Sequence, residues 1–364
     1  MSQDSAQNRS RSLTHQDSAK NPREPKDTSR TVSKVSVWDC ITGIIAVLGL
    51  IMAVIAFCEG RHNASLARRI KVENLLNQAW DFLGGKEGKP RLGTKMIVHD
   101  TARDQTQLEL ASRKISEALT LDPDNPRVIR MYGDLLSASG KTKEAIEMYQ
   151  RAIRIDPEDA KTHNALGLSL GDLGRQEDAM AAFRRAIELD PEIAVFYNNL
   201  GTAQFKQGKL DEAVSSFREA LQLAPDFAMA QTNLGAALHE QGKSEEALAA
   251  LKRAVFLDEN YAEAHYNLGV ILYDLGKLDQ AIVSFEMTIR LDPSHAQAYS
   301  NLGTCLSLKG KQKEAIKHLQ NAIYLDPEGL LPYESLEIIY RSQGDTDKAS
   351  AVAAKAAALR ETER

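Results

Sequence analysis

The sequence predicts an all-α protein in which one transmembrane helix precedes a right-handed α-solenoid of antiparallel helix pairs. Three observations support this fold class. A pattern of 34 residues occurs seven times from residue 126 onward. Each copy holds two amphipathic segments that flank a glycine. Nearer the N-terminus, 18 consecutive residues carry no charge.

Residues 1–37 are predicted to be a disordered tail. Residues 1–34 contain seven Lys or Arg and four Asp or Glu, but only one leucine, one valine and no aromatic residue. Such a segment cannot bury enough apolar surface to offset the chain entropy that is lost on folding. A solvated tail is therefore favoured over a basic docking segment.

Residues 38–59 are predicted to form the transmembrane helix. The uncharged stretch 41–58 would span about 27 Å as a helix, close to the hydrocarbon core of a bilayer. Asp39 and Glu59 bracket it, and Trp38 lies where interfacial aromatic residues are common. A cleaved signal peptide ending near "VIA" is the alternative, although the long polar stretch that precedes the apolar run is unusual for one.

Basic residues around this segment indicate its orientation only weakly. Four Lys or Arg precede it and four follow it within the range over which such residues act. The further basic residues of the tail favour a tail inside the cytoplasm and repeats outside it, in a periplasm or lumen. We therefore expect a single-pass membrane protein, with the cytoplasmic side still open for the repeats.

Residues 60–125 are predicted to hold a linker helix and a degenerate first repeat with an insertion. "VENLLNQAWDFLGGK" fits the first helix of a repeat, and "LELASRKISEALTLDP" fits the second, with Ala111 and Ala118 in register. About twenty residues around "EGKPRLGTKMIVHDTARDQ" would then be inserted between the two helices.

Seven complete repeats follow, and each is predicted to be a helix, a turn and a second helix. Their boundaries are 126–159, 160–193, 194–227, 228–261, 262–295, 296–329 and 330–364. A glycine that can adopt the left-handed conformation stands in every turn, and a proline usually ends the second helix. One such unit cannot bury its apolar face alone, so neighbouring units must stack into a continuous core.

The conserved spacing inside each unit has a packing explanation. A small residue in the first helix, such as Gly201, would let the second helix approach closely, while an alanine and then an aromatic or leucine, such as Ala213 and Phe217, fill the contact. This L-G, A-x3-F and P pattern at a 34-residue period resembles the tetratricopeptide repeat family over residues 126–360. The seventh unit departs from the pattern with Glu337 and Ala353, which suits a terminal cap.

The sequence contains no motif of an enzyme, a cofactor site or a metal site. Phosphate-binding loops, a GxSxG nucleophile motif and HExxH are all absent, and the three cysteines form no CxxC pair. The formal net charge of -5 argues against a general nucleic-acid-binding protein. We therefore expect no catalysis, cofactor, metal or nucleic acid, and expect protein or peptide partners.

The resemblance implies that the first helices line a concave groove that contacts peptides. An asparagine occupies the sixth position of four successive units: Asn199, Asn233, Asn267 and Asn301. An amide can both accept from and donate to a peptide backbone, whatever the peptide sequence. The row resembles the asparagine ladder in the repeats of O-GlcNAc transferases. The alternative is that the amides only bond neighbouring helices or water.

Apolar and aromatic residues are expected beside this row. Phe205, His239 and Tyr273 share the twelfth position, with Met229 and Tyr266 nearby. Amides flanked by such side chains suit an extended peptide with hydrophobic residues. The sequence therefore predicts a membrane-anchored interaction scaffold. The alternative is a non-catalytic, substrate-recruiting relative of O-GlcNAc transferase repeat regions that acts with a separate enzyme.

Overall fold

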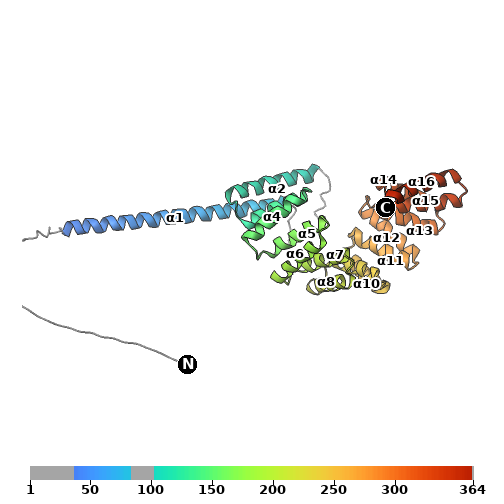
Figure 1. The fold of residues 1–364 in the computed structure, drawn as a ribbon, viewed down its shortest axis with the longest axis horizontal. Helices are drawn as coiled ribbons and strands as arrows, with labels where there is room; N and C mark the ends of the chain where they lie inside the picture. Colours follow the sequence, from blue (N-terminus) through green and yellow to red (C-terminus); the bar gives the residue numbers. More distant parts are fainter. Residues whose placement is uncertain (1–36, 83–101, 363–364) are drawn as a thin grey trace, which may run out of the picture. The chain divides into compact units, whose positions relative to one another are not determined.

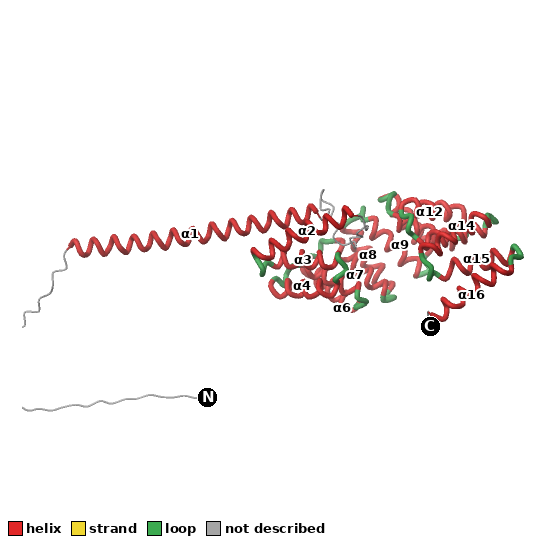
Figure 2. Tube along the Cα trace, turned by 90° about the horizontal axis from the view of Figure 1, so that it is seen from above, coloured by secondary structure: helices red, strands yellow, loops and turns green. Residues whose placement is uncertain are grey.

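The computed structural model describes residues 37–82 and 102–362, and all regular structure in these ranges is helical. Figure 2 shows the helices joined by short loops. The all-α expectation is therefore confirmed. The helices are α1 (Val37–Phe82), α2 (Ala102–Leu121), α3 (Pro126–Ala138), α4 (Thr142–Ile155), α5 (Ala160–Asp172), α6 (Gln176–Leu189), α7 (Ala194–Lys206), α8 (Leu210–Leu223), α9 (Ala228–Glu240), α10 (Ser244–Leu257), α11 (Ala262–Asp274), α12 (Leu278–Leu291), α13 (Ala296–Leu308), α14 (Gln312–Leu325), α15 (Leu330–Ser342) and α16 (Thr346–Thr362).

The chain divides into two compact units, residues 1–65 and residues 66–364. Helix α1 contributes residues to both units. No helix in the described part of the chain is long and apolar enough to cross a membrane. The predicted transmembrane segment 38–59 lies within α1, but the side chains of residues 37–49 and 57 lie outside the described residues, as do the tail and the inserted segment. The transmembrane assignment stays a prediction.

In the second unit, α3 to α16 form seven helix pairs that follow one another along a curved path (Figure 1). In the first six pairs the first helix has 13 residues and the second has 14. Each second helix packs against its own first helix, and the second helices of the first six pairs also pack against the first helix of the next pair. This is the stacking that the 34-residue period predicts.

The turn inside each pair uses its glycine as expected. At Gly276 φ is +70°, in the left-handed region, and the Lys277 N–H donates to the Leu272 carbonyl at 2.8 Å. This bond closes the end of α11 and satisfies a carbonyl that the helix itself leaves unpaired. The same positive φ occurs in all seven turns, at Gly140, Gly174, Gly208, Gly242, Gly276, Gly310 and Gly344.

The glycine inside each first helix has a different role, which is close contact. A Cβ built on Gly201 would lie 2.7 Å from Cε1 of Phe217, a side chain that is 1% exposed. A Cβ built on Gly235 would lie 2.6 Å from Cγ of Leu251. These distances are too short for any side chain larger than hydrogen, so each glycine is matched to the large residue opposite.

The end of α1 packs with α2 and α3 in one apolar cluster. Val72 and Leu76 of α1 lie with Ile115 of α2 and Met131 of α3, and all four are buried. Lys71 and Glu117 form an ion pair at 3.1 Å across α1 and α2. The C-terminal part of α1 and α2 thus occupy the place of a helix pair before the first complete repeat.

Candidate functional site

The four predicted asparagines each lie on a different first helix, α7, α9, α11 or α13. We call Asn199, Asn233, Asn267 and Asn301 the asparagine ladder. Asn199 is 5% exposed, whereas the other three are half-buried. A ligand in the groove would therefore reach the later three more readily than Asn199.

Three amides of the ladder bond the preceding repeat. The Nδ2 of Asn199 donates to Oδ1 of Asn164, and the Nδ2 of Asn233 donates to Oδ1 of Asn198, both at 2.9 Å. The Nδ2 of Asn301 donates to the hydroxyl of Tyr266 at 3.3 Å. Each bond joins residues 35 apart, so the sixth position of one repeat contacts the fifth position of the repeat before it.

Asn267 is the exception. Its Nδ2 donates to Oε1 of Glu263 in its own helix at 3.5 Å, a long bond in an exposed setting. Thr232, which stands where the other repeats have Asn164, Asn198 or Tyr266, donates its hydroxyl to the Ala228 carbonyl instead. The junction between α9 and α11 therefore lacks the amide bond that joins the other first helices.

The carbonyl oxygens of these amides are the groups left for a ligand. Within the described ranges, the Oδ1 atoms of Asn233, Asn267 and Asn301 have no hydrogen-bond donor from the protein. In Asn267 and Asn301 the Nδ2 group also keeps a second N–H after donating once, whereas the Nδ2 of Asn233 also lies 3.5 Å from the Thr202 hydroxyl. The bonds to the preceding repeat orient each amide, and an oriented amide loses less entropy when a ligand binds.

The side chains predicted beside the ladder are partly buried in the repeat core. Phe205, Tyr266 and Tyr273 pack against the main apolar cluster and keep part of their surface exposed. Burial raises the pKa of the Tyr266 hydroxyl, so it stays a neutral hydrogen-bonding group. His239 pairs through Nε2 with Oδ2 of Asp274 at 2.8 Å.

Met229 is connected to the ladder indirectly, through Asn198. The Nδ2 of Asn198 lies 3.8 Å from the Met229 sulfur, and this asparagine is itself the acceptor for Asn233. Met229 is thus linked to the ladder through Asn198, while Phe205 and Tyr273 contact the apolar cluster and His239 pairs with Asp274. Sequence reasoning missed Asn164 and Asn198, although a search for amide pairs 35 residues apart would have found both.

No described group of histidine, cysteine, aspartate or glutamate side chains could hold a metal ion. Burial raises the pKa of the Cys305 thiol to about 11, so it stays protonated at neutral pH. His163 and His265 use Nε2 to bond backbone carbonyls of Pro157 and Glu259, at 3.1 and 3.0 Å. These polar residues have structural partners within the repeats.

Comparison with known families agrees with this geometry. Models described as TPR repeat match residues 133–174 and 237–276, and models described as tetratricopeptide repeat match residues 164–228, 216–249, 262–295 and 296–328. Together the matches run without a gap from residue 133 to residue 328. The chain belongs to the tetratricopeptide repeat family. Such repeats form protein-protein interaction scaffolds, and no enzymatic domain is indicated.

Three solved structures illustrate what this chain is similar to. YrrB, described as a TPR protein with an unusual peptide-binding site, is 30% identical, with a TM-score of 0.42 over 53% of this chain and 99% of its own. The Cut9-Hcn1 hetero-tetramer of the APC/C is 17% identical, with a TM-score of 0.60 over 74% of this chain and 52% of that one. PilF of Pseudomonas aeruginosa is 21% identical, with a TM-score of 0.52 over 57% and 95%. Among curated proteins, none matches the sequence.

Proposed function

We propose that this tetratricopeptide repeat protein is a membrane-anchored scaffold that binds extended peptide segments of partner proteins along the asparagine ladder. One observation carries the proposal. The amides of Asn233 and Asn301 are held by the preceding repeat through Nδ2, while their Oδ1 atoms have no protein donor in the described ranges. Acceptors repeated once per helix pair suit a ligand whose donors also recur along its length, which is a peptide backbone.

The expected affinity is modest. A net hydrogen bond contributes about 1 kcal/mol, so three accessible amides contribute about 3 kcal/mol together. Asn199 should add little because it is buried and already bonded to Asn164. Further affinity must come from apolar contacts, for which Met229, Phe205 and Tyr273 offer partly exposed surface beside the ladder.

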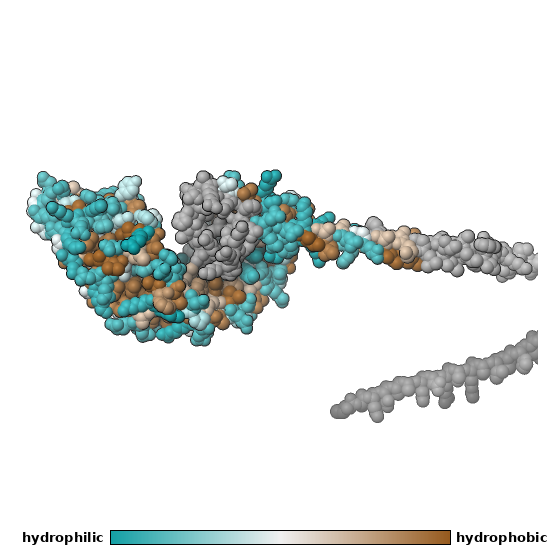
Figure 3. Space-filling view, turned by 180° about the vertical axis from the view of Figure 1, so that it is seen from behind, coloured by the Kyte–Doolittle hydropathy of each residue, from teal (hydrophilic) through white to brown (hydrophobic). Residues whose placement is uncertain are grey.

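The anchoring half of the proposal rests on α1. Among the described side chains of this helix, seven large apolar ones are exposed to between 44% and 69%, and five of them lie in the predicted transmembrane segment: Leu50, Ile51, Met52, Val54 and Ile55. Figure 3 shows apolar surface, drawn brown, along this extended helix. So much exposed apolar surface on one helix is rare in a soluble protein and needs an apolar environment. We propose a bilayer, with the repeats on its extracytoplasmic side.

Binding at the ladder can be tested with the full-length chain in nanodiscs. Phage-displayed random linear peptides are selected on it, and the affinity of one selected peptide is measured by fluorescence polarisation. The triple variant Asn233→Ala, Asn267→Ala and Asn301→Ala should weaken binding by about a hundredfold, which corresponds to about 3 kcal/mol. The control is Gln222→Ala with Gln320→Ala, which removes exposed amides from second helices and should leave the affinity unchanged.

A modified peptide sharpens this test. N-methylation of backbone amides removes the donors that would bond the Oδ1 atoms, and it should weaken binding to the wild type but not to the triple variant. Equal losses in both proteins would show that the amides only connect repeats. Unchanged affinity in a triple variant with wild-type circular dichroism would reject the ladder as a binding site.

The anchor has its own test. After alkaline carbonate washing the wild-type chain should stay with the membrane, while a variant with Ile51→Lys, Val54→Lys and Ile55→Lys should be released. Protease added to sealed vesicles then reports which side carries the repeats. Release of the wild type by carbonate would reject the anchor without affecting the ladder proposal.

The second candidate function is recruitment of substrates for a separate glycosyltransferase. It is favoured by the recurrence of the asparagine at one repeat position, which resembles O-GlcNAc transferase repeats. A glycosyltransferase that co-purifies with the chain, and that loses substrates when the ladder is changed to alanine, would favour this candidate over a general scaffold.

A further inference from the structure

A groove lies between α4 and α6, with α5 as its floor, and it has a volume of about 480 Å³. We call it the basic groove. Ile153 of α4, Leu166 and Leu170 of α5 and Ala182 of α6 give it an apolar floor and walls. The space exists because Ala181 and Ala182 stand on the α6 wall, where larger side chains would fill it. This volume falls within the usual range of ligand sites.

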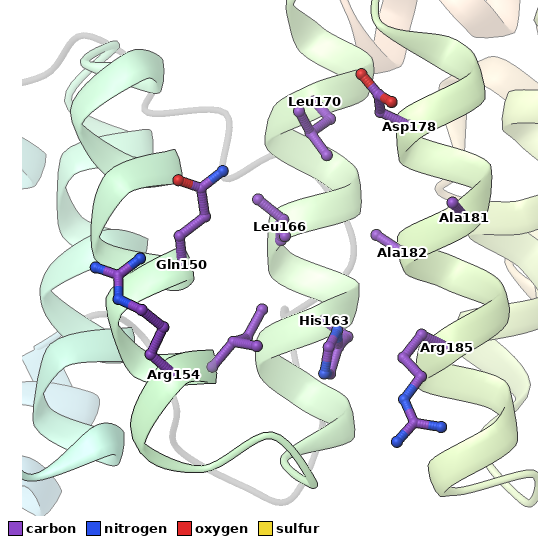
Figure 4. Close-up of a pocket in the computed structure, with 10 residues that line it drawn as sticks. Gln150, Arg154, His163, Leu166, Leu170, Asp178, Ala181, Ala182 and Arg185 are labelled. Carbon is purple, nitrogen blue, oxygen red and sulfur yellow. The ribbon is translucent and has the colours of Figure 1, made fainter.

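The basic side chains of this groove lie toward one end, and the carboxylate of Asp178 lies toward the other. Figure 4 shows Arg154, His163 and Arg185 near the first end, while Leu170 and Asp178 lie toward the second. Arg154 has no ion-pair or hydrogen-bond partner among the described residues. Among the described residues, Arg185 pairs with Glu188 alone, at 3.0 Å in an exposed setting, where an ion pair is weak and readily exchanged.

The histidine between the two arginines is held in place. Its Nε2 lies 3.1 Å from the Pro157 carbonyl oxygen, and because a carbonyl only accepts, Nε2 carries a proton. Asn164, the next residue of α5, instead points toward the following repeat, where its Oδ1 accepts from Asn199 of α7. The basic groove therefore uses a different face of α5 from the one that contacts the ladder residue Asn199.

The next repeat provides a natural comparison. A groove of about 310 Å³ lies one repeat further on, floored by α7, and it keeps the apolar residues Ile187 and Leu200. We call it the acidic groove, because Glu188 and Glu219 stand where the basic groove has Arg154 and Arg185. In both grooves these residues lie near the C-terminal ends of second helices, where the helix dipole favours a positive charge. Because glutamates occupy these positions in the acidic groove, the dipole alone does not require arginine there. The two arginines are therefore specific to the basic groove and are not repeated at the same positions of the groove one repeat further on.

From these observations we infer that the basic groove is a second binding site, which takes an extended acidic peptide segment of a partner protein with an aliphatic side chain beside an Asp or Glu. The carboxylate pairs with Arg154 or with Arg185, which stand on opposite walls of the groove, and the aliphatic side chain lies on Leu166 and Ala182. From His163 to Leu170 the floor runs about 10 Å, the length of about three extended residues. Charge complementarity selects an anion, and the open, elongated apolar floor accepts a chain that continues beyond the groove.

The test uses the full-length chain in nanodiscs, with methyl NMR signals assigned for Ile153, Leu166 and Leu170. The probe is the acetylated and amidated peptide Gly-Leu-Glu-Gly. Saturable shifts are expected at these methyls and not at Ile187 or Leu200 of the acidic groove. The variant Arg154→Glu with Arg185→Glu should weaken binding at least about tenfold, equivalent to about 1.4 kcal/mol. All these arginines are exposed, so folding should be unaffected.

Arg290→Glu is the matched control, because Arg290 is exposed and occupies in α12 the position that Arg154 has in α4. It should leave the affinity unchanged. Equal shifts with Gly-Leu-Lys-Gly, or no effect of the double arginine change, would overturn the inference. Shifts caused by octanoate but not by the peptide would overturn it as well and assign the groove to a small amphiphile. None of these outcomes depends on the ladder, whose alanine variants should bind the probe normally.

Discussion

The fifth and seventh repeats differ at one contact, and the difference explains why the repeated glycine is there. In the fifth, a Cβ built on Gly269 would lie 2.6 Å from Cε1 of the fully buried Phe285. In the seventh, the same two positions hold Glu337 and Ala353. Glu337 is only partly buried and pairs with Arg341 at 2.6 Å. Once the large residue opposite is gone, the glycine is no longer needed. The 34-residue pattern therefore records pairs of contacting residues.

The largest expected effect comes from breaking the contact in the fifth repeat. Gly269→Ala should lower the free energy of unfolding by about 1–3 kcal/mol, because the new methyl group overpacks against Phe285. Glu337→Ala in the seventh repeat should change it by less than about 0.5 kcal/mol. Urea unfolding of the full-length chain, followed by circular dichroism, measures both.

A double-mutant cycle checks the cause of that effect. In a Phe285→Ala background the space opposite Gly269 is empty, so Gly269→Ala should then cost much less. If Gly269→Ala costs the same in both backgrounds, the glycine is required for another reason, and the comparison between the two repeats fails.

A smaller effect should separate the members of the asparagine ladder. Asn199→Ala removes the donor that bonds Oδ1 of Asn164 and leaves that buried atom unpaired, so it should cost about 1 kcal/mol of folding free energy or somewhat more. Asn267→Ala should cost less than about 0.5 kcal/mol, since its only bond is long and exposed. Equal costs for the two variants would mean that the inter-repeat bonds do not stabilise the array.

The repeat architecture could be predicted from sequence because its signals are local and periodic. Seven turn glycines and the paired Gly and Phe or Leu positions fix helix length, turn and contact independently of any partner. The asparagine ladder was predicted as a row for the same reason. Its bonding was not predicted, because an inter-repeat bond depends on which residue stands at the fifth position of the preceding repeat. That residue is asparagine, threonine or tyrosine in different repeats.

The basic groove could not be predicted from the sequence for a related reason. Its walls come from second helices of two repeats, and its floor from a first helix between them. The small side chains Ala181 and Ala182 leave space only because α4 and α6 flank α5 at this spacing. In the sequence, Arg154 and Arg185 are two exposed arginines among many. Only their common position at one end of the groove distinguishes them.

The first repeat differs from the later ones in carrying a pair of nearly buried charged residues. Where the second to sixth repeats have neutral side chains, it has Arg130 and Asp134, which pair at 3.0 Å and are nearly buried. Tyr149 also donates its hydroxyl to Asp134 at 2.9 Å. Burial, the largest influence, raises the pKa of Asp134 above its usual value of 3.8, although the charge of Arg130 acts in the opposite direction.

The smallest expected effect is a change in how stability depends on pH. For a carboxyl whose pKa is raised on folding, the stabilisation is full below the unfolded pKa of 3.8 and is lost as the pH rises through the folded value. Asp134→Asn removes this titration while its side-chain oxygen can still accept the Tyr149 hydroxyl. The difference in unfolding free energy between wild type and this variant should therefore shrink from about pH 4 to about pH 7, measured by urea unfolding at each pH. If the difference instead grows with pH, the attraction of Arg130 outweighs the burial of the carboxylate, and this pair stabilises the first repeat much as the glycine contacts stabilise the later ones.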